Sequence, residues 1–268
     1  MADRPQNLPD FASPPLGEVV IGVQFAPSKK YSAVFSKDIW ELYRADYPYV
    51  QEQPPLEPSF ETFGGSNYQP NMQFQLGNSP RHSRLWFSSK DHSHLIQFQS
   101  DRFLLNWRKS TSDHTYPRFE SISATFEKHL KTLKEYYLAS LKTQLEINQA
   151  EVTYVNNIPL DNYPQVGEWF RFFDTKEINV EGVNISFTEV FDDLHGKPSA
   201  RMTYELQSVI SVDGKSKAFR FVLTYRGKPA GKDISQALSF AYQGREMIVN
   251  RFKELTTKRA HQSWEIVE

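Results

Sequence analysis

The feature that most constrains the fold is a series of short apolar runs at residues 85–109, which read LWFSSKDHSHLIQFQSDRFLLNWRK. Polar residues separate these runs, a pattern typical of antiparallel strands joined by short turns. The alternation of large apolar residues changes parity between Phe98 and Phe103. Because strand side chains alternate between faces, Ser100 and Asp101 must form either a tight turn or a bulge. The stretch predicts a sheet with one apolar face, and it predicts no reaction.

Further strands, together with helices, are predicted along the rest of the chain. Alternating or β-branched runs predict strands at residues 18–25, 72–76, 151–156, 178–191, 202–206 and 219–225. Apolar residues every three or four positions predict short helices at residues 36–46 and 166–173, and long helices at residues 119–145 and 234–255. Asp213-Gly214 is a hairpin signal, Asp233 can cap the last helix, and the prolines of residues 51–58 (QEQPPLEP) exclude a central strand there.

The order of these elements repeats. We predict an α+β fold of two similar halves, each an antiparallel sheet with a short helix and a long C-terminal helix. Residues 1–15 would be a flexible N-terminal arm, residues 16–148 the first half, and residues 149–268 the second half. The interpretation depends on element order, because no repeat of individual residues is evident. The two sheets would join edge to edge or pack face to face.

Composition narrows the classes of protein to consider. Aromatic residues make up 14% of the 268 residues, which favours a large aromatic core, and the formal net charge of −1 gives no overall basic footprint for nucleic acid. The absence of cysteine excludes disulfides and thiolate chemistry. The Pro-rich N-terminus has no apolar signal core, and no run is long enough to span a membrane. We expect a soluble, cytoplasmic protein that does not enter membranes.

Several arginines follow aromatic residues, as in Trp107-Arg108, Phe219-Arg220 and Tyr225-Arg226. Neighbouring residues on a strand face opposite sides, so each pair would place a ring inward and a cation outward. If these cations converge, they form a basic face for nucleic acid or an acidic protein, and otherwise they are a solvated sheet surface. Trp264 would either dock on the body or anchor a partner. The candidate contact residues are therefore Arg84, Arg102, Arg108, Arg226 and Trp264.

Two polar clusters offer weaker hypotheses of a metal-dependent or small-molecule enzyme. The first comprises His82, His92, His94 and Asp91, and the second Asp192, Asp193 and His195. Both fall in predicted turns, where polar residues gather for ordinary reasons. Phosphate-binding glycine loops, nucleophile elbows and zinc-helix motifs are absent from the sequence. We therefore expect no catalytic residues, no metal and no cofactor.

The opening PPLGEVVIGVQF, the central LIQFQSDRFLLNWRK followed by YPRF, the EVTYVN strand, and His261 with Trp264 carry a resemblance. The chain resembles a sporadically distributed family of uncharacterised prokaryotic proteins of similar length. The resemblance implies an accessory role, for instance in antiviral defence or in toxin-linked loci, and transfers no catalytic residue.

We expect a non-enzymatic binding or adaptor protein that acts through a protein partner. The alternative is a nucleic-acid-binding protein that uses a basic sheet face backed by aromatic residues. Its repeated element order resembles the saddle topology of TATA-binding-type folds, although fold alone does not determine function.

Overall fold

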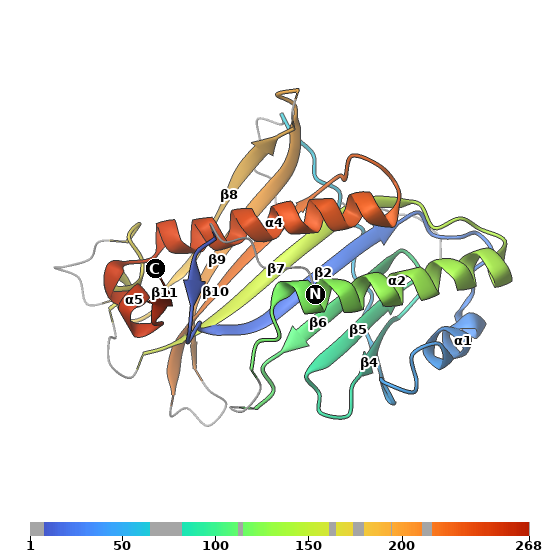
Figure 1. Cartoon of the computed structure of the whole chain (residues 1–268), viewed down its shortest axis with the longest axis horizontal. Helices are drawn as coiled ribbons and strands as arrows, with labels where there is room; N and C mark the ends of the chain where they lie inside the picture. The colour runs from blue at the N-terminus through green and yellow to red at the C-terminus, as the bar shows by residue number, and fades with distance from the viewer. Residues whose placement is uncertain are drawn as a thin grey trace.

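The computed structural model describes residues 8–64, 82–111, 115–160, 165–173, 180–193, 195–210 and 216–267. Its centre is a nine-stranded antiparallel sheet in the order β3-β4-β5-β6-β2-β7-β10-β9-β8, which carries two long helices on one face (Figure 1). The strands are β2 (Leu16–Phe25), β3 (Tyr49–Gln53), β4 (Arg84–Ser88), β5 (His94–Gln99), β6 (Arg102–Arg108), β7 (Ile147–Pro159), β8 (Asn184–Asp192), β9 (Pro198–Ile210) and β10 (Lys217–Gly227). The predicted α+β class is confirmed.

The strand order is symmetric about the centre of the sheet. β2 and β7, the first long strand of each half, lie side by side, and each also pairs with the last strand of its own half, β6 or β10. The remaining strands follow outward in reverse chain order. The structure therefore has one continuous nine-stranded sheet where two sheets were predicted.

The change of parity near Ser100 is a tight turn between two strands, not a bulge. β5 and β6 pair on either side of it, with Phe98 opposite Phe103 and Ile96 opposite Leu105. All four of these side chains are buried on the helix-covered face. The turn lets both strands present their apolar residues to the same core.

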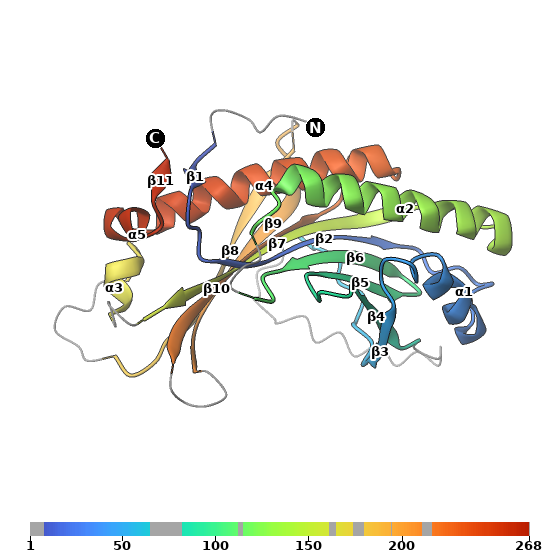
Figure 2. The same ribbon diagram turned by 60° about the horizontal axis from the view of Figure 1, so that its bottom comes forward.

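Two long helices, α2 (Phe119–Leu141) and α4 (Ile234–Leu255), cover one face of the sheet side by side (Figure 2). α2 ends earlier than predicted because Lys142 adopts a left-handed conformation with φ of 49°, which stops the helix. The Asp233 side chain accepts a hydrogen bond from the Gln236 amide, which confirms the predicted cap of α4. The shorter helices are η1 (Ala33–Phe35), α1 (Ser36–Glu41), α3 (Val166–Trp169) and α5 (Lys258–Ser263).

Residues 8–15, which were expected to form part of a flexible arm, are held against the body. β1 (Asp10–Phe11) pairs with β11 (Ile266–Val267), and the Phe11 ring packs 5.7 Å from that of Phe252. Burial of apolar side chains in this Pro-rich segment explains why the expectation was wrong for residues 8–15.

Some expectations lie beyond the described ranges. The predicted strand at residues 72–76 and the Asp213-Gly214 turn fall outside the described residues, although β9 and β10 pair antiparallel on either side of that turn. Within the described part of the chain, no helix is long and apolar enough to cross a membrane.

Candidate functional site

The face of the sheet opposite the helices, called here the open face, carries mostly polar side chains. One row of cross-strand neighbours runs through Gln99, Arg102, Gln24 and Gln149, and the next through Gln97, Leu104, Gly22, Glu151, Arg226 and Arg201. Apolar residues with the opposite parity fill the core beneath the helices. The open face is thus a polar surface that regular strands build across both halves of the sheet.

Residues 54–64, called here the strap, lie on part of the open face and are held by side chains of the sheet. Gln24 accepts from the Ser59 amide and donates to the Ser59 carbonyl, both at 2.9 Å. Gln99 makes the same pair of bonds with Leu56, at 2.8 and 2.9 Å. Each glutamine therefore bonds both the backbone N–H and the backbone carbonyl of one strap residue, as a neighbouring strand would.

Arginines complete the attachment of the strap. Arg102 donates to the Glu57 carbonyl at 2.7 Å, and Arg201 forms an ion pair of 2.7 Å with Glu61. Arg226 Nη1 lies 3.9 Å from the same Glu61 carboxylate. The strap therefore contacts strands of both halves, and a cavity of about 200 Å³ remains beneath it.

The four arginines predicted as a basic face do share the open face, but their charges are largely matched. Arg102 is 7% exposed and pairs with Asp101, Arg108 pairs with Glu18 at 2.8 Å, and Arg226 pairs with Glu151 at 2.7 Å. Paired guanidinium groups contribute little to the attraction of a phosphate backbone.

Arg84 bonds Gln97 at 2.8 Å, and its guanidinium lies 5.4 Å from the ring of Trp86. Burial, together with the charges of Arg102 and Arg108, lowers the pKa of Arg84, which reflects how closely these cations gather. Arg108 lies over the same tryptophan at 5.1 Å. Arg84, Arg102 and Arg108 therefore lie close together in the first half of the face.

Trp264 is 4% exposed, so it docks on the body. Its ring stacks on Trp169 at 5.7 Å and on Phe252 at 5.0 Å. A partner would reach Trp264 only if α5 moved, and the sequence pattern of the C-terminus did not distinguish these two outcomes.

Hydroxyl groups line the open face of the second half. Thr188, Thr203, Thr224 and Thr153 are cross-strand neighbours on β8, β9, β10 and β7. The Thr153 and Thr224 hydroxyls lie 2.9 Å apart, and all four side chains are partly exposed. This neutral, polar row suits hydrogen bonding to another protein better than attraction of a polyanion.

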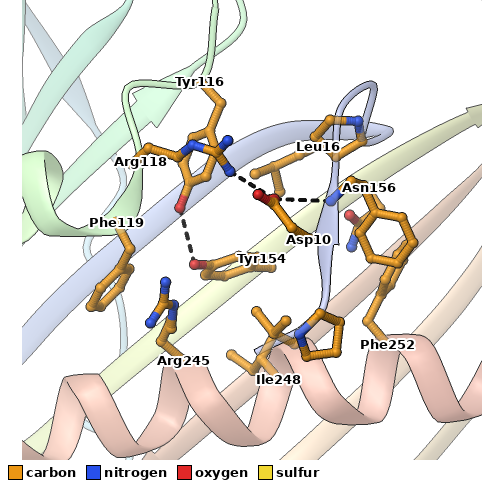
Figure 3. A pocket seen from close by; sticks show the side chains of 14 residues that line it. Asp10, Leu16, Tyr116, Arg118, Phe119, Tyr154, Asn156, Arg245, Ile248 and Phe252 are labelled. Atoms are coloured by element: carbon orange, nitrogen blue, oxygen red, sulfur yellow. Dashed lines mark hydrogen bonds and ion pairs between the residues drawn. The ribbon is translucent and has the colours of Figure 1, made fainter. Parts of the chain in front are cut away.

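A small cavity of about 70 Å³ lies on the helix side, between the start of α2, the middle of α4 and the N-terminal segment (Figure 3). Tyr116 and Tyr154 share a hydrogen bond of 3.1 Å there, and burial raises the pKa of Tyr154 to about 12. Arg245 pairs with Glu120 at 3.1 Å, and Arg118 pairs with Asp10 at 2.8 Å.

Two features of this cavity are costly to the fold. Arg118 has φ of 72°, which a side-chain-bearing residue rarely adopts, and Nη1 of buried Arg245 makes no hydrogen bond with the described part of the chain. Both tyrosines remain protonated at neutral pH, so their hydroxyl groups can donate hydrogen bonds in this cavity.

The two histidine-containing clusters do not meet. His92 stacks on Tyr49 at the β4–β5 turn, whereas Asp193 accepts from the His195 amide at the β8–β9 turn, near the opposite edge of the sheet. Among the described residues, no group of histidine and carboxylate side chains forms a metal site. The enzyme hypothesis required these clusters to converge in one pocket, and the topology separates them.

The sequence prediction missed the strap and its receptor residues Gln24 and Gln99. Three prolines marked residues 51–58 as a connector, but nothing in a single glutamine indicates a backbone partner far along the chain. It also missed a local repeat: residues 102–108 read RFLLNWR and residues 220–226 read RFVLTYR, with Arg, Phe, Leu and Arg identical. Comparing β6 with β10 would have found that signal.

The search of protein-family models found none that matches this chain, and the search of curated proteins found no significant match.

Proposed function

We propose that this protein is a non-enzymatic binding or adaptor protein that acts through a protein partner on its open face. The observation that carries the proposal is the strap: the open face already holds a polypeptide segment by bonds to its backbone. Such bonds bind a chain with little regard to its side chains, and nearby pockets and charges then provide specificity.

The electrostatics of the face support a protein partner over nucleic acid. Arg102, Arg108 and Arg226 each have a carboxylate partner, and the strap adds Glu61 to this surface. A nucleic-acid site needs cations that can replace the counterions condensed on the phosphate backbone, and an arginine already paired with a carboxylate does this poorly. The hydroxyl row of the second half adds donors and acceptors without net charge.

We further propose that the two halves derive from one duplicated unit. RFLLNWR on β6 aligns with RFVLTYR on β10, and EVVIGV on β2 aligns with EVTYVN on β7. The alignment also superposes two ion pairs: Glu18–Arg108 between β2 and β6 corresponds to Glu151–Arg226 between β7 and β10. Matching sequence, register and ion pairs together support common descent better than element order alone.

The biological setting that we propose rests on the family resemblance. The sporadic distribution of the similar prokaryotic proteins suits an accessory or regulatory component of an antiviral defence system in the cytoplasm. An adaptor in that setting would bind a protein encoded nearby.

Affinity capture of the full chain from a host that carries the neighbouring genes tests the proposal. We expect a stoichiometric protein in the eluate and a protein-like ratio of absorbance at 260 and 280 nm. The same capture with Thr203→Lys, which places a cation in the hydroxyl row, should lose that protein. No stoichiometric protein, or a nucleic-acid-like ratio that falls after nuclease treatment, would contradict the proposal.

A further inference from the structure

We propose that the open face contains a second backbone-binding site, the row of side chains Gln207, Arg220 and Asn157, called here the second groove. It takes a segment of a protein partner as Gln99, Arg102 and Gln24, called here the first groove, take the strap. The inference rests on the proposed function, because the occupant is a segment of that partner. It adds the position of the site, the groups that hold the segment, and the pattern that the segment must have.

The first groove consists of three cross-strand neighbours. Arg102 on β6 lies opposite Gln24 on β2 and opposite Gln99 on β5. The two amide side chains bond the backbone of strap residues three positions apart, and the arginine between them bonds the carbonyl of Glu57. The spacing of the strands sets the spacing of the bonded backbone groups.

The second half repeats this arrangement. Arg220 on β10 lies opposite Asn157 on β7 and opposite Gln207 on β9. Arg220 is the first residue of RFVLTYR, as Arg102 is the first of RFLLNWR, so the two arginines correspond in sequence as well as in register. In both halves, an arginine therefore lies between two side-chain amides on the open face.

The second groove differs from the first in its occupancy. The side chains of Gln207, Arg220 and Asn157 make no hydrogen bond or ion pair with the described part of the chain, and all three are at least partly exposed. The matching residues of the first groove are buried beneath the strap. Three polar side chains without a partner among the described residues can therefore bond the backbone of another segment.

The correspondence also predicts an acidic residue in the occupant. Glu61 of the strap, two residues after Ser59, pairs with Arg201 at 2.7 Å and lies 3.9 Å from Arg226, which pairs with Glu151 of the sheet at 2.7 Å. Its counterpart is Arg108, which pairs with Glu18 and lies over Trp86. By analogy, Arg108 would pair with a carboxylate of the occupant. That carboxylate would belong to the residue two positions after the one whose backbone Asn157 bonds.

The occupant is thus a segment without secondary structure whose backbone is bonded at two positions three residues apart, followed two residues later by Asp or Glu. The strap itself provides the template, since Leu56, Ser59 and Glu61 occupy these positions in the first groove.

A labelled peptide that reproduces residues 54–63, PPLEPSFETF, is the probe for this groove. Fluorescence anisotropy with the full chain should show saturable binding, weakened at least about tenfold by Arg220→Glu because a charged hydrogen bond is lost. Lys128→Glu, the same charge change at an exposed site on α2, should leave binding unchanged. Thermal unfolding should be alike for all three proteins, because the Arg220 side chain makes no hydrogen bond or ion pair with the residues that the structure describes.

Two results of the peptide assay would overturn the second groove. One is no binding at about 1 mM peptide, which corresponds to roughly −4 kcal/mol, and the other is binding that Arg220→Glu leaves unchanged. The latter would show that the peptide exchanges with the strap in the first groove. A captured partner that binds Arg220→Glu as well as wild type would also refute the groove, while the proposed function would stand.

Discussion

Removing the Gln24 amide should release one end of the strap. Gln24→Ala deletes the two bonds to Ser59, and each neutral hydrogen bond contributes about 1 kcal/mol net. The variant also removes an acceptor of Arg102 at 3.2 Å, but Asp101 and the Glu57 carbonyl still accept from that guanidinium. We therefore expect the free energy of strap opening to fall by about 2 kcal/mol.

Hydrogen exchange measures that opening directly. The Ser59 amide donates to Gln24, so its protection reports the strap. A loss of about 2 kcal/mol corresponds to exchange roughly 30-fold faster at Ser59. Exchange of the Leu56 amide, which is bonded to Gln99, reports the other end of the strap. Its rate should rise less than that of Ser59 if the two ends open separately, and equally if the strap opens as a unit.

Gln207→Ala is the matched control, because Gln207 corresponds to Gln99 in the second half but its side chain makes no hydrogen bond with the described part of the chain. It should leave exchange at Ser59 and the midpoint of unfolding unchanged. Unaltered exchange at Ser59 in Gln24→Ala would refute the claim that side-chain amides hold this backbone to the sheet.

Three further predictions concern the core. Burial lowers the pKa of His129 from 6.5 to about 4, so the unfolded chain binds a proton at a higher pH than the folded chain does. The free energy of unfolding should therefore fall by about 3 kcal/mol as the pH decreases from 6.5 to 4. In His129→Gln, the free energy of unfolding in urea should depend less on pH between pH 7 and 4.5, and an unchanged pH dependence would contradict this. Trp264→Ala should cost about 3–5 kcal/mol in chemical denaturation, since the ring is buried against Trp169; a loss below about 1 kcal/mol would place the ring outside the core. Glu120→Gln should lower the free energy of unfolding by about 3 kcal/mol, because it leaves the buried Arg245 charge unmatched. Adding Arg245→Met should recover most of that loss. A double variant as unstable as Glu120→Gln alone would show that the unmatched charge is not the cause.

The sequence determined the local elements of the fold well because hydrophobic periodicity reports which face each residue buries. The parity change between Phe98 and Phe103 required a turn or bulge, and the cap at Asp233 followed from its position before an apolar stripe. The end of α2 was missed, since a left-handed residue such as Lys142 has no signature when it is not glycine.

The candidate site was predictable in part. Alternation correctly placed Arg102 and Arg226 on one face, but it did not reveal that Asp101, Glu151 and Glu61 match their charges. These partners come from other strands and from the strap, and such long-range pairings follow from the register of the whole sheet.

Site-specific photocrosslinking in the host tests the central claim most directly. A photoreactive residue at Gln207 on the open face is compared with one at Lys128 on the exposed side of α2. The account predicts that Gln207 captures the protein found by affinity purification and that Lys128 does not. Capture from Lys128 alone, or no protein captured from Gln207, would contradict a partner site on the open face.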